Sequence, residues 1–335
     1  PSAAINSKTP VLINLLKSWQ SVNTILKSFL QIKLRCEYIQ QKGREMSGNA
    51  KTIADRLQMR LDTLTRAERQ LAHLILENYP VSGLGPITAV AEAAKVSTPT
   101  VARMVQKLGF KGYGEFQSEL REELKAQISG PIAKHDTWAE KAPVGHVLNR
   151  FTEAVIGNIR HSLGQIETES FDQACALLAD TDRSLRIVGG RITHTMAEYL
   201  FLHMQVIRPN VTHIQSTSNA WPHYLLDVKE GDVLVVFDMR RYENNTLKLA
   251  EMAHQRGAKI ILFTDQWRSP IHSFAEVVFS SRIVVPSAWD SVATTLLLVE
   301  TIISAVQDLT WDETRDRMEN LEDIFDKTKL FRKFT

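Results

Sequence analysis

The sequence predicts two domains, an all-α domain followed by an α/β domain whose parallel sheet is flanked by helices. Two short amphipathic helices around a tight turn, at residues 86–111, indicate the first domain. From residue 185 onward, apolar runs rich in β-branched residues alternate with helical stretches, which is typical of a parallel sheet. Between these parts, residues 129–143 contain three helix breakers and no apolar stripe, as an interdomain linker would.

Length, charge and cysteine content narrow the class of protein. A chain of 335 residues fits about two domains, and 44% hydrophobic residues suffice for real cores. The net charge is only +2, so contact with nucleic acid requires a local basic face. Cys36 and Cys175 match no metal or redox spacing, and we expect a reducing, cytoplasmic setting without metal or cofactor.

Residues 1–45 differ from the rest of the chain. An apolar helical stripe at 11–34 is interrupted by Lys17, Lys27 and Lys33, so no run reaches the roughly 18–20 residues of a membrane span. We therefore expect no membrane anchor. The extension is either a helix that lies on a partner, on a membrane surface or on its own chain, or an artefact of a start site assigned too early. The second alternative is suggested by Met46, which would be a natural first residue.

The first domain is expected to span 46–128. An apolar stripe predicts a helix at 53–64, and Thr65 with Glu68 forms a capping box for the next helix, which ends near Tyr79. After the helix pair at 86–111, a glycine-rich corner at 110–114 precedes an amphipathic helix at 115–128. About five helices can therefore bury their apolar faces together.

The helix pair at 86–111 has the features of a helix-turn-helix. Ser97 is expected to cap the second helix by accepting a backbone N–H, Pro99 fits its first turn, and Gly109 fits the position after its end. Small residues that allow the two helices to cross closely are Ala91, Ala93 and Ala94. From Lys95 to Lys111 there are four basic residues and no acidic one. The alternative is an ordinary helical hairpin with a solvated basic face.

The second domain is expected to span 144–310, followed by a C-terminal helix and tail at 311–335. Helices are predicted at 144–168, 171–179, 245–256 and 292–309, and strands at 185–190, 211–214, 232–238, 259–265 and 275–279. In open parallel sheets, ligands bind at the carboxyl ends of the strands. The residues after these strands are therefore the candidate ligand site.

The chain as a whole, after Met46, resembles the RpiR (or MurR) family of bacterial transcription regulators. The segments that carry this resemblance are 64–69, 75–78, 96–103 and 107–113 in the first half, and 189–191, 240–242, 258–265 and 269–270 in the second. The family pairs a helix-turn-helix with a sugar isomerase (SIS) domain that senses phosphorylated sugars. The resemblance implies a DNA-binding regulator, commonly a repressor of carbohydrate or small-metabolite catabolism, that binds a palindromic operator as a homodimer or homotetramer.

The resemblance also assigns candidate sites. The operator-facing set is Ser97, Thr98, Thr100, Arg103 and Gln106, with Lys107 and Lys111 toward phosphates. The candidate effector set is Gly190, Arg191, Thr193, Asp238, Arg240, Arg241, Tyr242, Thr246 and Ser291.

The candidate effector site departs from the family pattern. The second loop usually reads Ser-x-Ser-Gly-x-Thr/Ser with a later Thr, whereas here Asp238, Arg240, Arg241 and Glu243 stand at the matching positions and only Thr246 is kept. Carboxylates repel phosphate. The two arginines either restore attraction for a small anion, such as a sugar phosphate, or pair with Asp238 and Glu243 as a structural lock.

Two other functions are compatible with parts of the sequence. An SIS-fold sugar phosphate isomerase needs a base, for which His194, Glu198 and His223 are the candidates, and an assembly module would bind protein through its helical half. We expect no enzymatic activity, because a fused helix-turn-helix is explained by coupled sensing and DNA binding.

Overall fold

The computed structural model describes residues 52–77, 79–135, 146–215 and 220–331. The N-terminal extension at 1–45, with Cys36 and the expected basic helix, lies outside these residues. The predictions made for that extension therefore remain predictions.

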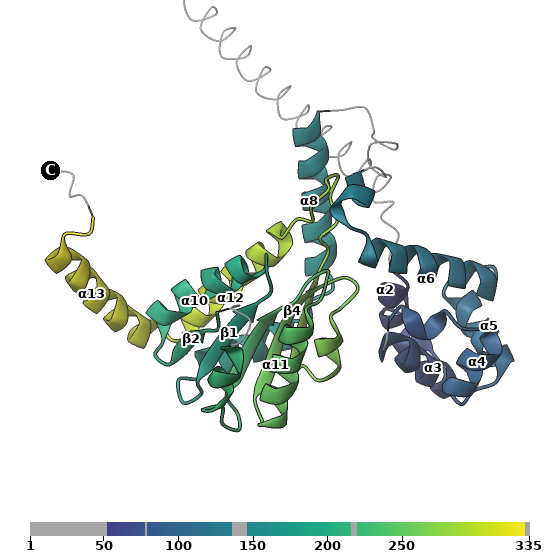
Figure 1. Ribbon diagram of the computed structural model, residues 1–335, viewed down its shortest axis with the longest axis horizontal. Helices are drawn as coiled ribbons and strands as arrows, with labels where there is room; N and C mark the ends of the chain where they lie inside the picture. Colours follow the sequence, from purple (N-terminus) through teal and green to yellow (C-terminus); the bar gives the residue numbers. More distant parts are fainter. Residues whose placement is uncertain (1–51, 78, 136–145, 216–219, 332–335) are drawn as a thin grey trace, which may run out of the picture. The chain divides into compact units, whose positions relative to one another are not determined.

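The helical module contains the predicted helix-turn-helix. Its elements are α2 (Ile53–Gln58), the 3-10 helix η1 (Leu61–Thr63), α3 (Arg66–Glu77), η2 (Val81–Gly83), α4 (Ile87–Ala93), α5 (Thr98–Lys107) and α6 (Tyr113–Ile128) (Figure 1). The prediction of one helix over 53–64 was wrong, because α2 ends at Gln58. Met59, the first residue after α2, is 60% exposed, so packing does not hold the helix at this point, although Leu64 further along the stripe is buried.

A capping box begins α3, as the sequence predicted. The Thr65 backbone N–H donates to Glu68 Oε2 at 2.8 Å, and the Glu68 N–H donates to Thr65 Oγ1 at 3.4 Å. Glu68 Oε2 also lies 2.7 Å from Lys107 Nζ of α5. One buried carboxylate thus begins one helix and ties it to the end of another.

The α/β domain holds a parallel sheet of five strands in the order β2-β1-β3-β4-β5. The strands are β1 (Leu185–Gly189), β2 (Val211–His213), β3 (Val233–Phe237), β4 (Lys259–Asp265) and β5 (Val277–Ser281). β1 and β3 are buried along their whole length, which explains why their sequences are continuous apolar runs. The predicted fold class is confirmed.

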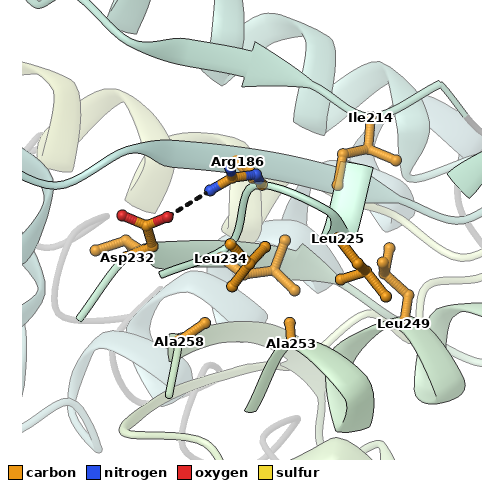
Figure 2. Close-up of a pocket in the computed structure, with 10 residues that line it drawn as sticks. Arg186, Ile214, Leu225, Asp232, Leu234, Leu249, Ala253 and Ala258 are labelled. Atoms are coloured by element: carbon orange, nitrogen blue, oxygen red, sulfur yellow. Dashed lines mark hydrogen bonds and ion pairs between the residues drawn. The ribbon is translucent and has the colours of Figure 1, made fainter. Parts of the chain in front are cut away.

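Helices cover both faces of the sheet. One core packs the sheet against α9 (Thr168–Ala179), α10 (His194–Ile207) and α12 (Ala293–Leu309). The other packs it against α11 (Asn244–Gln255) and the 3-10 helices η3 (Trp221–Leu225) and η4 (Pro270–Ser273). Figure 2 shows the second core near the amino ends of the strands, where Arg186 and Asp232 form a buried ion pair at 2.8 Å. This ion pair lies at the sheet edge opposite the candidate ligand site.

Two segments around the predicted linker differ from expectation. Residues 131–135 are helical, whereas the sequence predicted a linker from 129 to 143, and 136–143 lie outside the described part. The following helix α8 (Val147–Leu163) is shorter than the predicted 144–168, because its C-cap is Gly164 and Glu167 caps α9. Breakers in the sequence therefore did not prevent a helical turn directly after α6.

The described chain ends with α13 (Trp311–Thr328), which follows α12 after a bend of 102°. Within the described ranges, no single helix is long and apolar enough to cross a bilayer. Among the described helices, only α12 and α13 taken together, as this bent pair, have the necessary length and composition.

Candidate functional site

The orientation of α5 is set by its buried face. Val101, Met104 and Val105 are fully buried, which turns Arg103 and Gln106 to solvent. Gly109 has φ +96°, the left-handed conformation that ends a helix and favours glycine. The second helix thus presents a polar, basic face of the kind that enters a major groove.

The start of α5 is held differently from the sequence prediction. Ser97 occupies the N-cap position, but its hydroxyl lies 2.9 Å from Thr100 Oγ1, and the expected bond to a backbone N–H is absent. Thr100 is buried, and its hydroxyl also accepts from Arg103 at 3.4 Å. Thr100 therefore orients its neighbours, while Ser97 and Arg103 remain exposed.

Helix crossing uses two of the three predicted small residues. Ala91 and Ala94 are buried at 4% and 3% exposure, whereas Ala93 faces solvent. Of the three, only Ala91 and Ala94 are therefore placed to let α4 and α5 approach closely.

The two lysines assigned to phosphates lie in different settings. Lys107 Nζ is engaged by Glu68, as described above. Lys111 is exposed, and its backbone N–H donates to Glu115 Oε2 at 2.6 Å. Thr98, at the start of α5, is half-buried. Of the predicted set, the side chains that face solvent most openly are Ser97, Arg103, Gln106, Lys107 and Lys111.

The loops after β1, β3 and β4 meet at the carboxyl edge of the sheet, as expected. The Thr193 hydroxyl donates to the Phe237 carbonyl at 2.8 Å and accepts from the Gly190 N–H at 2.9 Å. The Arg191 N–H donates to Glu243 Oε1 at 2.7 Å. Thr193 thus closes its own loop, and Glu243 supplies an internal anion to the loop after β1.

Asp238 is a buried acid at the end of β3. It is 2% exposed and accepts from the Ser269 hydroxyl at 2.5 Å and from the Glu243 N–H at 3.4 Å. Burial raises the pKa of Asp238 to about 7, because the two hydrogen bonds only partly offset the loss of hydration and the nearby acids add repulsion. Near neutral pH this group therefore carries less negative charge than an ordinary aspartate.

Asp265, at the end of β4, organises the loop after β3. Its carboxylate accepts from the Arg240 N–H at 2.6 Å, from the Tyr242 hydroxyl at 2.7 Å and from the Trp267 N–H at 2.9 Å. Full burial raises the pKa of Asp265. The predicted effector residue Tyr242 is thus anchored to the sheet.

The arginine lock exists, but with a partner that the sequence did not indicate. Arg240 Nε lies 3.3 Å from Asp290 Oδ2, and its guanidinium stacks 4.2 Å from the centre of the Trp267 ring. Within the described residues, neither arginine forms an ion pair with Asp238 or Glu243. Arg241 is exposed with φ +64°. Arg240 is therefore committed to a structural contact, and Arg241 carries the accessible charge.

The remaining predicted effector residues are partly or fully occupied by internal contacts. Thr246 is buried at 5% exposure within α11. The Ser291 hydroxyl accepts from the Ala293 N–H at 3.3 Å, at the start of α12. Arg191 remains exposed, so it lies with Arg241 among the accessible cations of this edge.

The three candidate bases of the isomerase alternative do not form a common site with the arginine loop. His194 stacks on His213 with ring centres 4.5 Å apart, while Glu198 and His223 are exposed on α10 and η3. His194 is thus part of an aromatic pair that packs α10 against β2.

Sequence reasoning did not predict Asp290, Trp267 or Lys134 as members of this site, and it gave Asp265 no role in binding the effector. Asp265 was recognisable as a strand-end residue. Lys134 Nζ lies 2.5 Å from Asp290 Oδ1, yet it occurs in the segment predicted to be a linker, and Asp290 lies in a loop without a motif. Only the three-dimensional structure brings these two charges to Arg240.

Comparisons with known proteins identify both halves. The family model for the rpiR-family helix-turn-helix domain matches residues 53–127, and the SIS domain model matches residues 177–305. The chain is 26% identical over 219 residues to the HTH-type transcriptional regulator HexR of Pseudomonas aeruginosa, covering 64% of this chain and 73% of HexR.

Two further proteins are similar to different parts of the chain. The chain is 27% identical over 250 residues to the bifunctional protein glk of Paraburkholderia xenovorans, covering 72% of this chain but only 37% of that protein. The sugar isomerase domain of an RpiR transcription factor from Sphaerobacter thermophilus superposes with a TM-score of 0.49 at 17% identity, covering 52% of this chain and 97% of that domain. With an rpiR-type helix-turn-helix followed by an SIS domain, the chain belongs to the RpiR family of transcription regulators.

Proposed function

We propose that the protein binds a palindromic operator through α5 as a homodimer or homotetramer. The observation that carries this proposal is the solvent-exposed set of Arg103 and Gln106 on a helix whose opposite face is fixed by the core. A two-fold assembly would set the spacing of two such helices on the two half-sites.

Selection from random duplexes tests the DNA-binding proposal. The wild-type chain should enrich a palindrome, and Arg103→Ala should bind it more weakly by about 1–3 kcal/mol if Arg103 reads a base. Arg256→Ala is the matched control, because it removes an exposed arginine from the end of α11. Recovery of no enriched sequence at low salt would contradict the proposal.

We further propose that a small anionic metabolite, such as a phosphorylated sugar, binds at the carboxyl edge of the sheet and controls operator affinity. Its support is the pair of exposed guanidinium groups, Arg191 and Arg241, on the loops after β1 and β3. In this proposal the protein represses genes of carbohydrate or small-metabolite catabolism, and binding of the effector relieves the repression.

A thermal-shift screen tests the effector class. Phosphorylated sugars, sugar acids and uncharged polyols should be compared on the wild type, Arg241→Ala and Arg256→Ala. We expect a saturable stabilisation by one anion that is lost in Arg241→Ala and kept in Arg256→Ala. Equal stabilisation of all three proteins would remove the arginine loop from the effector site.

A further inference from the structure

The effector loop contacts the end of the DNA-binding module directly. We call this contact the seam: on one side lie residues 124–135, and on the other lie the loop 238–243 after β3 and the loop 282–292 between β5 and α12. Residues 124–128 are the end of α6, and 131–135 are the helical turn that follows it. The seam therefore joins the helical module to the sheet edge where the effector is proposed to bind.

One carboxylate holds two buried cations together in the seam. Asp290 Oδ1 lies 2.5 Å from Lys134 Nζ, and Asp290 Oδ2 lies 3.3 Å from Arg240 Nε. The side chains of Lys134 and Arg240 are only 8% and 7% exposed, whereas Asp290 is 21% exposed. Two poorly hydrated cations thus share one anion that remains reachable from solvent.

Neighbouring residues of the loop after β3 strengthen this contact. The Gln127 side chain of α6 lies beside the Tyr242 hydroxyl. Gly130 lies so close to Arg241 that a Cβ at this position would be 2.8 Å from a guanidinium nitrogen. Three consecutive residues, Arg240, Arg241 and Tyr242, therefore face the segment that leads out of the helix-turn-helix module.

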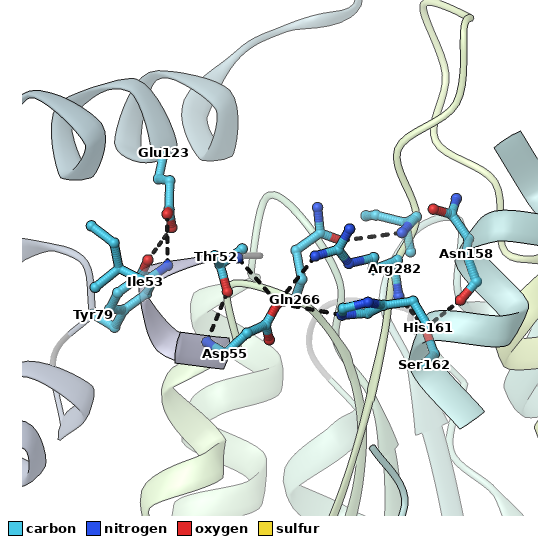
Figure 3. Close-up of polar contacts among 11 residues, drawn as sticks. Thr52, Ile53, Asp55, Tyr79, Glu123, Asn158, His161, Ser162, Gln266 and Arg282 are labelled. Atoms are coloured by element: carbon cyan, nitrogen blue, oxygen red, sulfur yellow. Dashed lines mark hydrogen bonds and ion pairs between the residues drawn. The ribbon is translucent and has the colours of Figure 1, made fainter. Parts of the chain in front are cut away.

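The loop 282–292 contacts the helical module at a second point. The Ser291 N–H donates to the Ile283 carbonyl at 2.8 Å, which closes the loop next to its start. Arg282 lies 3.1 Å from Asp55 Oδ2 of α2, and His161 of α8 lies 3.4 Å from the same oxygen (Figure 3). The two contacts with the helical module, through Asp290 and through Arg282, thus come from one short loop.

We propose that Asp290 is an internal stand-in for the effector: an anion that takes over Arg240 displaces Asp290, releases Lys134 and loosens the seam. This inference rests on the proposed effector control. A phosphate or carboxylate competes well for Arg240, because guanidinium binds such groups through two parallel hydrogen bonds. The effector can shift the equilibrium toward the state with a loosened seam, and so change the position of α5, only by as much as it binds that state more tightly than the closed one.

Amide hydrogen exchange of the full-length chain tests this inference without DNA. Asp290→Asn should speed exchange in residues 124–135 by roughly tenfold or more, because it leaves Lys134 and Arg240 without their shared anion. Glu276→Gln is the matched control, since it removes a carboxylate that pairs with Lys259 at 2.9 Å on the exposed surface. Lys134→Met provides a second variant that breaks the same contact from the other side.

Inorganic phosphate serves as the probe anion, compared with sodium chloride at equal ionic strength. We expect phosphate at tens of millimolar to speed exchange in 124–135 of the wild type and to have no further effect in Asp290→Asn or Arg240→Met. Unchanged exchange in both Asp290→Asn and Lys134→Met, or a phosphate effect that persists in Arg240→Met, would overturn the inference.

These results are separable from a failure of the proposed function. If random-duplex selection recovers a palindrome while Asp290→Asn and Lys134→Met leave hydrogen exchange in residues 124–135 unchanged, the proposed role of Asp290 is wrong and the DNA-binding proposal stands. If no palindrome is recovered while the two variants and phosphate open the seam, the regulator proposal fails and the anion-controlled seam stands.

Discussion

Replacement of Asp238 by asparagine should stabilise the protein at alkaline pH. Folding raises the pKa of this carboxyl from 3.8 to about 7 through burial, so the native state binds a proton that the unfolded chain has already lost. A group with a raised folded pKa favours the native state below pH 4, and this contribution is lost as the pH rises to about 7. A difference of about three pKa units corresponds to about 4 kcal/mol.

An asparagine side chain would match the protonated carboxylic acid in shape and avoid this loss. At pH 8, we expect Asp238→Asn to raise the free energy of unfolding by about 2–4 kcal/mol, since an amide reproduces the hydrogen bonds to Ser269 and the Glu243 N–H only in part. At pH 4 the gain should vanish. The stability of the variant should therefore depend less on pH than that of the wild type.

Urea unfolding followed by tryptophan fluorescence measures this effect. Four of the six tryptophans, Trp221, Trp267, Trp289 and Trp311, lie in the α/β part of the chain, and residues 52–128 contain none, so most of the signal follows the domain that contains Asp238. Asp227→Asn, which changes an exposed aspartate of the same domain, is the control and should alter stability little. A variant that is less stable than the wild type at pH 8, with the same pH dependence, would contradict this prediction.

Three further predictions concern stability. Glu123→Gln should also stabilise the chain at pH 8 and not at pH 4, because burial raises the pKa of Glu123 from 4.5 to about 7; equal effects at both pH values would contradict this. Arg186→Met should cost about 3–5 kcal/mol in urea unfolding, since it leaves Asp232 buried without its ion-pair partner. Gly189→Ala should lower the midpoint of thermal unfolding by the equivalent of about 1–3 kcal/mol, because its Cβ would lie 2.5 Å from the Thr193 carbonyl oxygen; an unchanged midpoint would show that the loop yields.

The fold could be predicted because its signals are local. Continuous apolar strands, the capping box at Thr65 and Glu68, and the positive φ at Gly109 each follow from a few neighbouring residues. The break after Gln58 was missed, since apolar residues at helical spacing continue past it. Exposure of Met59 shows that spacing alone does not supply a packing partner.

The candidate site could be predicted only in outline. Strand ends located the three loops, but which charges pair there depends on contacts between residues that are distant in the sequence. Lys134 and Asp290 are 156 positions apart, and their contact requires the helical turn after α6 to reach the sheet edge. Thr193 and Thr246, predicted as ligand contacts by resemblance, are buried within the fold. A hydroxyl in a loop sequence does not reveal whether the backbone has already engaged it.

Control of DNA binding by the effector can be measured as the affinity of the full-length protein for its selected duplex, with and without the anion that stabilises it in the thermal-shift screen. Fluorescence anisotropy at fixed ionic strength gives both dissociation constants. We expect a change of about 5-fold or more in the wild type, the range of ordinary allosteric coupling, and none in Arg241→Ala. An anion that binds the wild type and leaves its operator affinity unchanged would contradict the claim that the sheet edge controls DNA binding.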